Sequence, residues 1–413
     1  MGHGDLKDDA IIARLTTRCS SAFVLIASCW VVLCAQSTAP RPHPLPADAP
    51  KSERAPVSLF PVVPVWSLAL GSQLTVAPAY DATRVYFSLE GDRIAAYDIV
   101  SGERQWLVTA RPQMPPIAGD GLLFLVEPDA LTALNAVDGS VAWQLPFAEK
   151  LAVVPVWDNG WLVLATAIGE VLAFRATDGH LVWRQRFESP AHAPPALAAD
   201  RVYVPAENGR ILALQVETGA RLWERRLGGA VADIVAFDER IYAGSADNFF
   251  YCVMAKDGRV AWRWRTGADI TGRPIADDDR VYFVSLDNVL RALDLKSGAQ
   301  QWMRPLPLRP AWGPAKAGTT IVVAGLNVSA RAFDVKDGKP AGETPAGAEV
   351  SAQPHALLHP LTTAPMLLLV TRDIAKGAAA TLVMRSFDPP ITPVAPLPNL
   401  VDMTPKKPAP PPR

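Results

Sequence analysis

Two charged residues, Asp233 and Arg273, have the types and the spacing from which a binding site could be built. They stand 40 positions apart, which is the length of one module of an internal repeat in this chain. Equivalent positions of consecutive modules come close together when the modules pack side by side. We therefore predict a charge-assisted pair that joins two neighbouring modules. The alternative is that Arg273 binds a small anionic ligand, because a guanidinium recognises carboxylate and phosphate groups.

Acidic and histidine clusters give no comparable indication of a metal site. Asp277, Asp278 and Asp279 form an acidic run, but aspartates recur at this register in other modules, which is typical of exposed turns. His355 and His359 have a metal-compatible spacing only on a helix, whereas their surroundings predict strand and loop. The phosphate loop, the GxSxG elbow and HExxH are absent from the sequence. We assign no catalytic, metal or cofactor-binding residue and expect no cofactor.

Six arginines are candidates for an interaction surface. They follow a repeated tryptophan in three successive modules: Arg184, Arg186, Arg225, Arg226, Arg263 and Arg265. Arginine and tryptophan dominate the energetics of protein interfaces. The alternative is that these arginines are solvated charges that protect edge strands from aggregation.

The first 39 residues predict export and a membrane attachment. Arg14 and Arg18 precede an apolar run over residues 22–35, which is short for a bilayer span but suits a signal peptide. We leave open whether the segment is cleaved or retained as an anchor. Cys29 and Cys34 are the candidate lipidation sites, and the alternative is that both are small apolar residues of the signal or anchor helix.

Composition describes a globular chain between two proline-rich segments. Hydrophobic residues make up 49% of the sequence and charged residues 20%, and the formal charge of -1 disfavours nucleic acid as the partner. We predict a proline-rich linker over residues 40–62 and a proline-rich tail over residues 389–413. The body between them has a single cysteine, Cys252, so it holds no internal disulfide.

The body, residues 63–388, repeats with a period near 40 residues. Its marks are turn glycines at Gly102, Gly139, Gly179, Gly219, Gly258, Gly298 and Gly338. A tryptophan stands four residues after the first six, and a small residue stands six residues before each. Four short strands per module, separated by turn residues, predict the blade of a β-propeller. The glycine suits a positive φ, and the tryptophan suits the contact between blades.

The eighth module predicts how the ring closes. Strands are expected at 366–373 and 381–388, but no glycine and tryptophan follow them. Residues 63–70 carry Trp66 ahead of the first complete module, where a fourth strand would lack its own blade. The predicted fold is therefore an all-β, eight-bladed propeller of four-stranded antiparallel blades, closed by an N-terminal strand, with seven blades as the fallback.

The repeat pattern resembles that of the pyrroloquinoline-quinone-like propellers, as in AAYDIVSGERQW (residues 95–106) and RALDLKSGAQQW (residues 291–302). That family contains quinoprotein dehydrogenases and non-enzymatic envelope proteins, among them the lipoprotein scaffold of the outer-membrane β-barrel assembly machinery. An exported chain built almost wholly of one ring is similar to the second group. The dehydrogenases imply a calcium site and often adjacent cysteines, and no Cys-Cys pair occurs here.

The resemblance implies a non-catalytic protein-interaction scaffold of the bacterial cell envelope, in outer-membrane protein assembly. Its expected partners are envelope or outer-membrane proteins, with the membrane reached through the N-terminal segment and the propeller monomeric. The expected location is the periplasm or cell envelope. The alternatives are a quinone-binding oxidoreductase or small-ligand sensor that uses the central channel, and an adhesive envelope protein.

Overall fold

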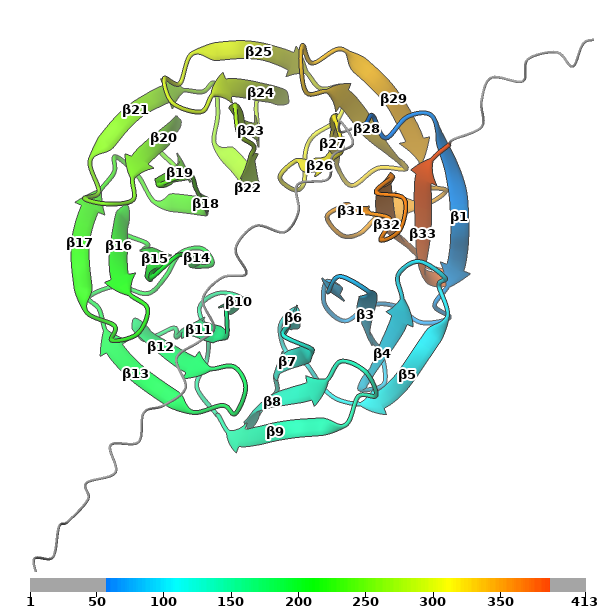
Figure 1. Ribbon diagram of the computed structural model, residues 1–413, viewed down its shortest axis with the longest axis horizontal. Helices are drawn as coiled ribbons and strands as arrows, with labels where there is room; N and C mark the ends of the chain where they lie inside the picture. Colours follow the sequence, from blue (N-terminus) through cyan, green and yellow to red (C-terminus); the bar gives the residue numbers. More distant parts are fainter. Residues whose placement is uncertain (1–56, 387–413) are drawn as a thin grey trace, which may run out of the picture. The chain divides into compact units, whose positions relative to one another are not determined.

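The described residues, 57–386 of the computed structural model, form a ring of eight β-sheets around a central channel (Figure 1). Each sheet is one blade, and its strands follow one another from the innermost strand at the channel to the outermost strand at the rim. This arrangement confirms the predicted eight-bladed propeller. The described part of the chain contains no helix that is long and apolar enough to cross a bilayer.

Seven blades are antiparallel sheets of four strands taken in sequence order. Blades 1 to 4 consist of β2 (Ala79–Tyr80), β3 (Arg84–Leu89), β4 (Arg93–Asp98), β5 (Arg104–Thr109), β6 (Ile117–Gly119), β7 (Leu122–Val126), β8 (Ala130–Asn135), β9 (Val141–Pro146), β10 (Val156–Asp158), β11 (Trp161–Ala165), β12 (Glu170–Arg175), β13 (Leu181–Arg186), β14 (Ala196–Ala198), β15 (Arg201–Pro205), β16 (Arg210–Gln215) and β17 (Arg221–Arg226).
Blades 5 to 7 consist of β18 (Val231–Phe237), β19 (Arg240–Ser245), β20 (Phe249–Met254), β21 (Val260–Arg265), β22 (Ile270–Ala276), β23 (Arg280–Ser285), β24 (Val289–Asp294), β25 (Gln300–Pro305), β26 (Ala315–Ala317), β27 (Thr320–Ala324), β28 (Ser329–Asp334) and β29 (Pro340–Pro345).

Blade 8 joins the two ends of the described chain. Its strands are β30 (Glu349–Val350), β31 (His355–Leu358), β32 (Pro365–Asp373), β33 (Gly377–Arg385) and β1 (Val62–Ala69). β1 pairs with β33, as predicted, and forms the outer edge. The innermost strand is interrupted, because β30 and β31 both pair with β32. A strand from each end of the sequence therefore closes the ring.

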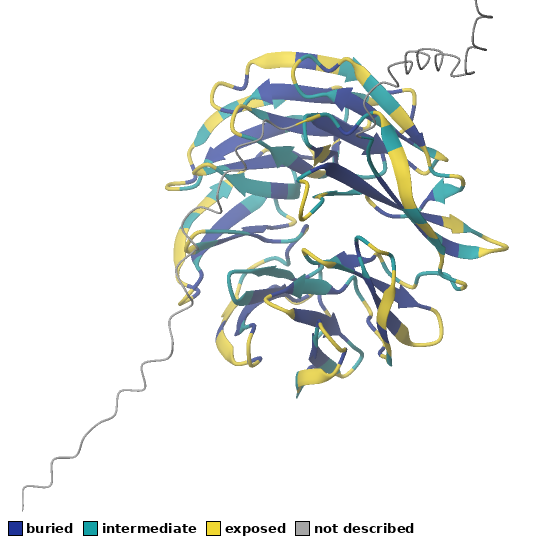
Figure 2. Ribbon diagram, turned by 45° about the vertical axis from the view of Figure 1, so that its right-hand side comes forward, coloured by how far each residue is buried: buried dark blue, intermediate teal, exposed yellow. Residues whose placement is uncertain are grey.

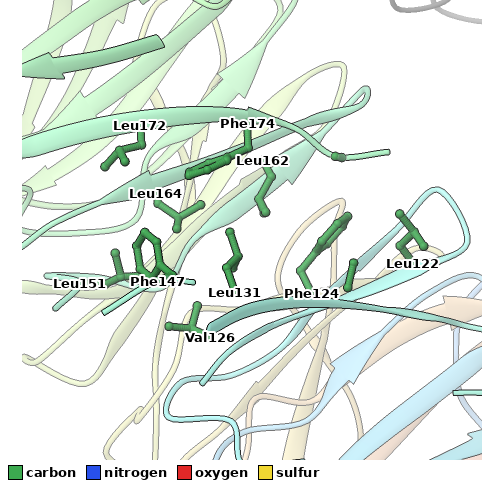
Figure 3. Close-up of a cluster of buried hydrophobic side chains, with 12 residues drawn as sticks. Leu122, Phe124, Val126, Leu131, Phe147, Leu151, Leu162, Leu164, Leu172 and Phe174 are labelled. Carbon is green, nitrogen blue, oxygen red and sulfur yellow. The ribbon is translucent and has the colours of Figure 1, made fainter. Parts of the chain in front are cut away.

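The middle strands of each blade are buried on both faces because each blade is packed between two neighbours. All five residues of β7 are buried, and the adjoining apolar run of β11 packs toward it. Figure 3 shows the leucine and phenylalanine side chains of blades 2 and 3 that meet in this interface. Exposed residues concentrate on the outer strands and hairpin tips (Figure 2). The core is thus a series of layers between blades.

A repeated indole contact fastens the outer edge of the ring. Each tryptophan donates from Nε1 to a backbone carbonyl of the next blade at 2.6–3.4 Å: Trp66 to Ile99, Trp106 to Ala136, Trp143 to Ala176, Trp183 to Val216, Trp223 to Ala255, Trp262 to Leu295 and Trp302 to Val335. In its own blade, each of the last six pairs with the small residue of the repeat, such as Ala173 opposite Trp183. The small residue leaves room for the ring.

The turn glycine has a second role beyond its backbone conformation. Gly219 adopts φ +70°, and a Cβ there would lie 2.7 Å from Cδ2 of Trp183 in the preceding blade. The other six turn glycines meet the preceding tryptophan in the same way. Glycine is therefore required both by its positive φ and by the indole that lies against it.

The seventh blade lacks its tryptophan, and an N-terminal residue takes its place. Gly342 pairs with Ala332 where other blades have tryptophan, and a Cβ on Gly342 would overlap the ring of Phe60. The neighbouring Leu59 is fully buried and donates its amide to Thr320. Arg385 donates to the carbonyls of Ser58 and Phe60 at 2.6 and 2.7 Å. These contacts hold the residues before β1 against blades 7 and 8.

The predicted signal or anchor (1–39) and the tail (389–413), with Cys29 and Cys34, lie outside the described residues, as does most of the predicted linker (40–62). They remain predictions.

Candidate functional site

The innermost strands of blades 5 and 6 differ from those of the other blades. β18 and β22 have seven residues each, whereas the innermost strands elsewhere have two to four. Both long strands are interrupted by a register shift, in β18 between Val231 and Ile234 and in β22 between Thr271 and Ile275. Bulges of this kind redirect side chains and often stand beside functional sites.

The two bulges carry the two charges singled out in the sequence. Asp233 lies in the bulge of β18 and Arg273 in that of β22. The charges interact, because Arg273 counteracts the rise that burial causes in the pKa of Asp233. In turn, desolvation lowers the pKa of Arg273 and Asp233 opposes that shift. The structure gives them no direct hydrogen bond or ion pair, so they attract each other across a gap.

Arg273 lines two cavities of the channel. The larger, about 570 Å³, is lined by the innermost strands of blades 1, 6, 7 and 8. The smaller, about 340 Å³, is lined by blades 2, 3 and 4 together with Arg273. Arg273 therefore lies at the channel between two cavities whose other lining residues come from its own blade and from six further blades.

Two aromatic residues of these cavities were not predicted as site residues. Tyr80 stacks on His355 with ring centroids 3.8 Å apart, and its hydroxyl is buried without a hydrogen-bond partner. In the smaller cavity, Nε1 of Trp157 is buried without a partner. Both stand at the same position of the repeat, where four other modules have alanine and the remaining two have Leu197 and Lys316.

The other polar clusters have structural roles. Burial lowers the pKa of His355 to about 4, and Nδ1 of His359 accepts the amides of Leu361 and Thr362. Asp277 caps its turn and pairs with Lys316 at 3.1 Å. No group of three or more His, Cys, Asp or Glu side chains within residues 57–386 could hold a metal ion.

The six candidate arginines fall into two groups. Arg184 pairs with Glu149 and Glu170 at 2.6 and 3.1 Å. Arg225 donates to the carbonyl of Gly258, and Arg263 lies 4.7 Å above the ring of Phe249. These three are engaged within the propeller. The remaining three, Arg186, Arg226 and Arg265, are exposed, and the structure gives their side chains no hydrogen bond or ion pair.

These three residues, which we call the arginine arc, occupy one position in three successive blades. Each ends the outer strand and stands three residues after the tryptophan: Arg186 in β13, Arg226 in β17 and Arg265 in β21. The equivalent residues of the other blades are Ala69, Thr109, Pro146, Pro305 and Pro345, none of them charged. The arc therefore places positive charge on blades 3 to 5 alone.

Four tryptophans stand outside the repeat register, and all four are partly buried. Trp157 and Trp161 pack at the clusters between blades 2, 3 and 4, Trp264 beside blade 6, and Trp312 beside blades 7 and 8. They act in packing rather than as an exposed aromatic surface.

Comparison with known proteins places this architecture in a family. The model described as outer membrane protein assembly factor BamB matches residues 63–150, 127–236 and 224–367. The chain belongs to the BamB family. A comparison with curated protein sequences found no match.

Solved structures with this fold include BamB and dehydrogenases. BamB from Moraxella catarrhalis is 20% identical with TM-score 0.61, over 80% of this chain and 99% of that chain. Quinohemoprotein alcohol dehydrogenase from Comamonas testosteroni is 14% identical with TM-score 0.61, over 80% and 78%. A europium-containing methanol dehydrogenase is 11% identical with TM-score 0.60, over 78% and 93%. At these identities the likeness shows the fold alone.

The described channel residues do not fit the calcium-bound quinone that the resemblance to quinoprotein dehydrogenases implies. Ca²⁺ takes six to eight oxygen ligands. The carboxylates that we find at the channel, Asp158 and Asp233, stand on blades 3 and 5, and Arg273 opposes a cation beside the second. We derive no reaction step through a quinone.

Proposed function

We propose that this BamB-family propeller is a non-catalytic protein-interaction scaffold of the bacterial cell envelope that acts in outer-membrane protein assembly. The family match supports the assembly role, and a ring closed by chain ends and fastened at its edge suits a rigid platform. The observation that carries the proposal is the arginine arc, because three neighbouring blades present unpaired guanidinium groups at one face.

The arc is suited to an acidic surface of a partner protein. Its residues stand beside the hairpins between the second and third strands, since the amides that follow them bond to those hairpins: Phe187 to Gly169, Leu227 to Gly209 and Thr266 to Asn248. The three charges therefore lie at the same face of the ring. An arginine without an internal acidic partner can form bidentate bonds to a carboxylate of another protein.

The N-terminal segment would export the chain and tether it to the membrane, with Cys29 and Cys34 as candidate lipidation sites. The proline-rich residues 40–62 would hold a monomeric propeller away from the bilayer. The expected location is therefore the periplasm or the cell envelope. Fractionation of membranes with and without salt washing tests the location.

Affinity purification of the tagged full-length protein from detergent-solubilised membranes tests the scaffold function. We expect components of the outer-membrane assembly machinery to be recovered in stoichiometric amounts. Reversal of the arc, R186E/R226E/R265E, should reduce their recovery at least tenfold, because three attractive contacts become repulsive.

A matched variant distinguishes the effect of the arginine arc on partner recovery from the effect of the protein's net charge. Arg104 begins the outer strand β5, and Arg259 and Lys296 lie in the turns that precede the outer strands β21 and β25. All three are exposed, and R104E/R259E/K296E makes the same change in net charge. This variant should retain the partners. Equal losses in both variants, or recovery of the protein alone, would contradict the proposal, and dye reduction after addition of quinone and Ca²⁺ would favour the oxidoreductase alternative.

A further inference from the structure

We propose that the central channel binds a small organic carboxylate whose acid group is held by Arg273. This site is independent of the scaffold function and of the arginine arc. It rests on where the backbone places Arg273, on the absence of a direct partner for its guanidinium, and on the polar and apolar groups around it.

The backbone around Arg273 is shaped to hold this side chain at the channel. Gly272 adopts φ +66°, a left-handed conformation that favours glycine, and a Cβ there would overlap the amide of Gly313. A Cβ on Gly313 would in turn overlap the carbonyl of Arg273. Blades 6 and 7 therefore meet through two glycines, and Gln353 of blade 8 donates to the Gly313 carbonyl at 3.4 Å. The bulge is fixed from three blades.

The guanidinium of Arg273 has hydrogen-bond donors that are not paired within the described residues. Arginine carries five N–H donors, and none of them makes a hydrogen bond or an ion pair with residues 57–386. Asp233 attracts the charge without contacting it. The other cation of the larger cavity, Lys316, is already paired with Asp277. Arg273 is also accessible to solvent, so a ligand in the channel can reach it.

The larger cavity favours an anion over a cation or a neutral polar molecule. Its lining contains Arg273, Lys316, Gln353 and Tyr80 but no Asp or Glu. The Tyr80 hydroxyl is buried and unpaired, and burial raises its pKa, so it stays protonated and can donate. A buried donor without a partner is uncommon in native proteins and calls for an acceptor such as a bound ligand.

The remaining lining limits the ligand to a carboxylate with an apolar body. Pro78, Pro314, Pro354 and Ile275 supply apolar surface next to the polar groups. The volume of about 570 Å³ lies within the range of small-molecule sites. A planar carboxylate matches the fork of a guanidinium, so an aromatic or short aliphatic acid fits better than a spherical anion.

Titration calorimetry with benzoate, benzamide and inorganic phosphate tests the site on the full-length protein. Benzoate should bind with a stoichiometry of one per chain, at least tenfold more tightly than benzamide, which lacks the charge, or phosphate, which lacks the apolar body. Arg273→Gln should weaken benzoate binding at least tenfold, and Arg273→Lys should restore part of it. Arg104→Gln, a change of an exposed outer arginine, should bind as the parent does.

Three outcomes would overturn the proposal: no heat with benzoate, equal binding of benzoate and benzamide, or unchanged binding by Arg273→Gln. Near-ultraviolet circular dichroism of Arg273→Gln establishes that the ring is folded. If that variant fails to fold, Tyr80→Phe replaces it in the titration, because it removes only the unpaired donor, and full retention of benzoate affinity by Tyr80→Phe would then count against the site.

Discussion

The outer edge of the propeller repeats one contact around the ring, whereas its inner edge differs from blade to blade. At the outer edge, seven tryptophans bond to the next blade and lie against its turn glycine. At the inner edge, blades 5 and 6 alone have long, bulged strands, and these carry Asp233 and Arg273. The same tryptophan contact forms seven of the eight junctions between blades, and at the junction after blade 7 Phe60 lies where the tryptophan is missing. The bulged inner strands and the arginine arc depart from the repeat. We therefore expect ligand binding at the bulged strands and partner binding at the arc.

The largest effect on the outer contact should come from Trp183→Ala. The indole is 8% exposed and its Nε1 donates to the Val216 carbonyl at 2.6 Å. Removal should lower the free energy of unfolding by about 3–5 kcal/mol, the usual cost for a buried large aromatic. Trp183→Phe keeps an aromatic ring but leaves the carbonyl unpaired, so it should cost about 1–3 kcal/mol. Denaturant unfolding measures both, and equal stability of Trp183→Ala and the parent would contradict the role of the contact.

A somewhat smaller effect is expected for Gly219→Ala. Its positive φ costs an alanine about 1–2 kcal/mol, and the added methyl presses on Trp183, for a total of about 2–4 kcal/mol. Gly121→Ala is the matched control, because Gly121 has φ +73° but nothing within 4 Å of an added Cβ. It should lose only the backbone part. Similar losses for both variants in denaturant unfolding would show that the indole does not matter.

The smallest effect concerns the inner edge and depends on pH. Burial lowers the pKa of His355 from 6.5 to about 4, so the folded state favours the neutral ring. Above pH 6.5 the ring is neutral in both the folded and the unfolded state, so the shift costs no stability. As the pH falls from 6.5 toward 4, the unfolded state takes up a proton that the folded state does not, and the free energy of unfolding falls by roughly 2–3 kcal/mol. His355→Phe keeps the stack on Tyr80 and removes the titration. Between pH 6.5 and 4 its stability should therefore fall less than that of the parent, and parallel curves would refute the assignment.

Much of the fold could be predicted because each module repeats the same turn glycine and, in six of seven cases, the same tryptophan. The turn glycines predicted seven modules, and Trp66 together with the strands expected at 366–373 and 381–388 indicated an eighth blade, with seven blades as the fallback. The contact between the indole and the glycine of the next blade was not foreseen, since the two residues are far apart in the chain. Phe60 could not be predicted as a substitute for the missing tryptophan either, because it stands outside the repeat.

Less of the candidate site could be predicted. The spacing of Asp233 and Arg273 indicated equivalent positions of adjacent modules, but the bulges that carry the two residues and the close approach of Gly272 to Gly313 are seen only in the structure. The six arginines looked equivalent in the sequence. Only the structure divides them, because Arg184, Arg225 and Arg263 meet partners on other strands or in a neighbouring blade.

Hydrogen–deuterium exchange of the propeller, alone and in the complex recovered from membranes, tests whether the arginine arc is the partner surface. We expect slower exchange at the ends of β13, β17 and β21 and in the adjoining hairpins of blades 3 to 5, and no such protection in R186E/R226E/R265E. Protection confined to other blades, or protection that survives reversal of the arc, would contradict it.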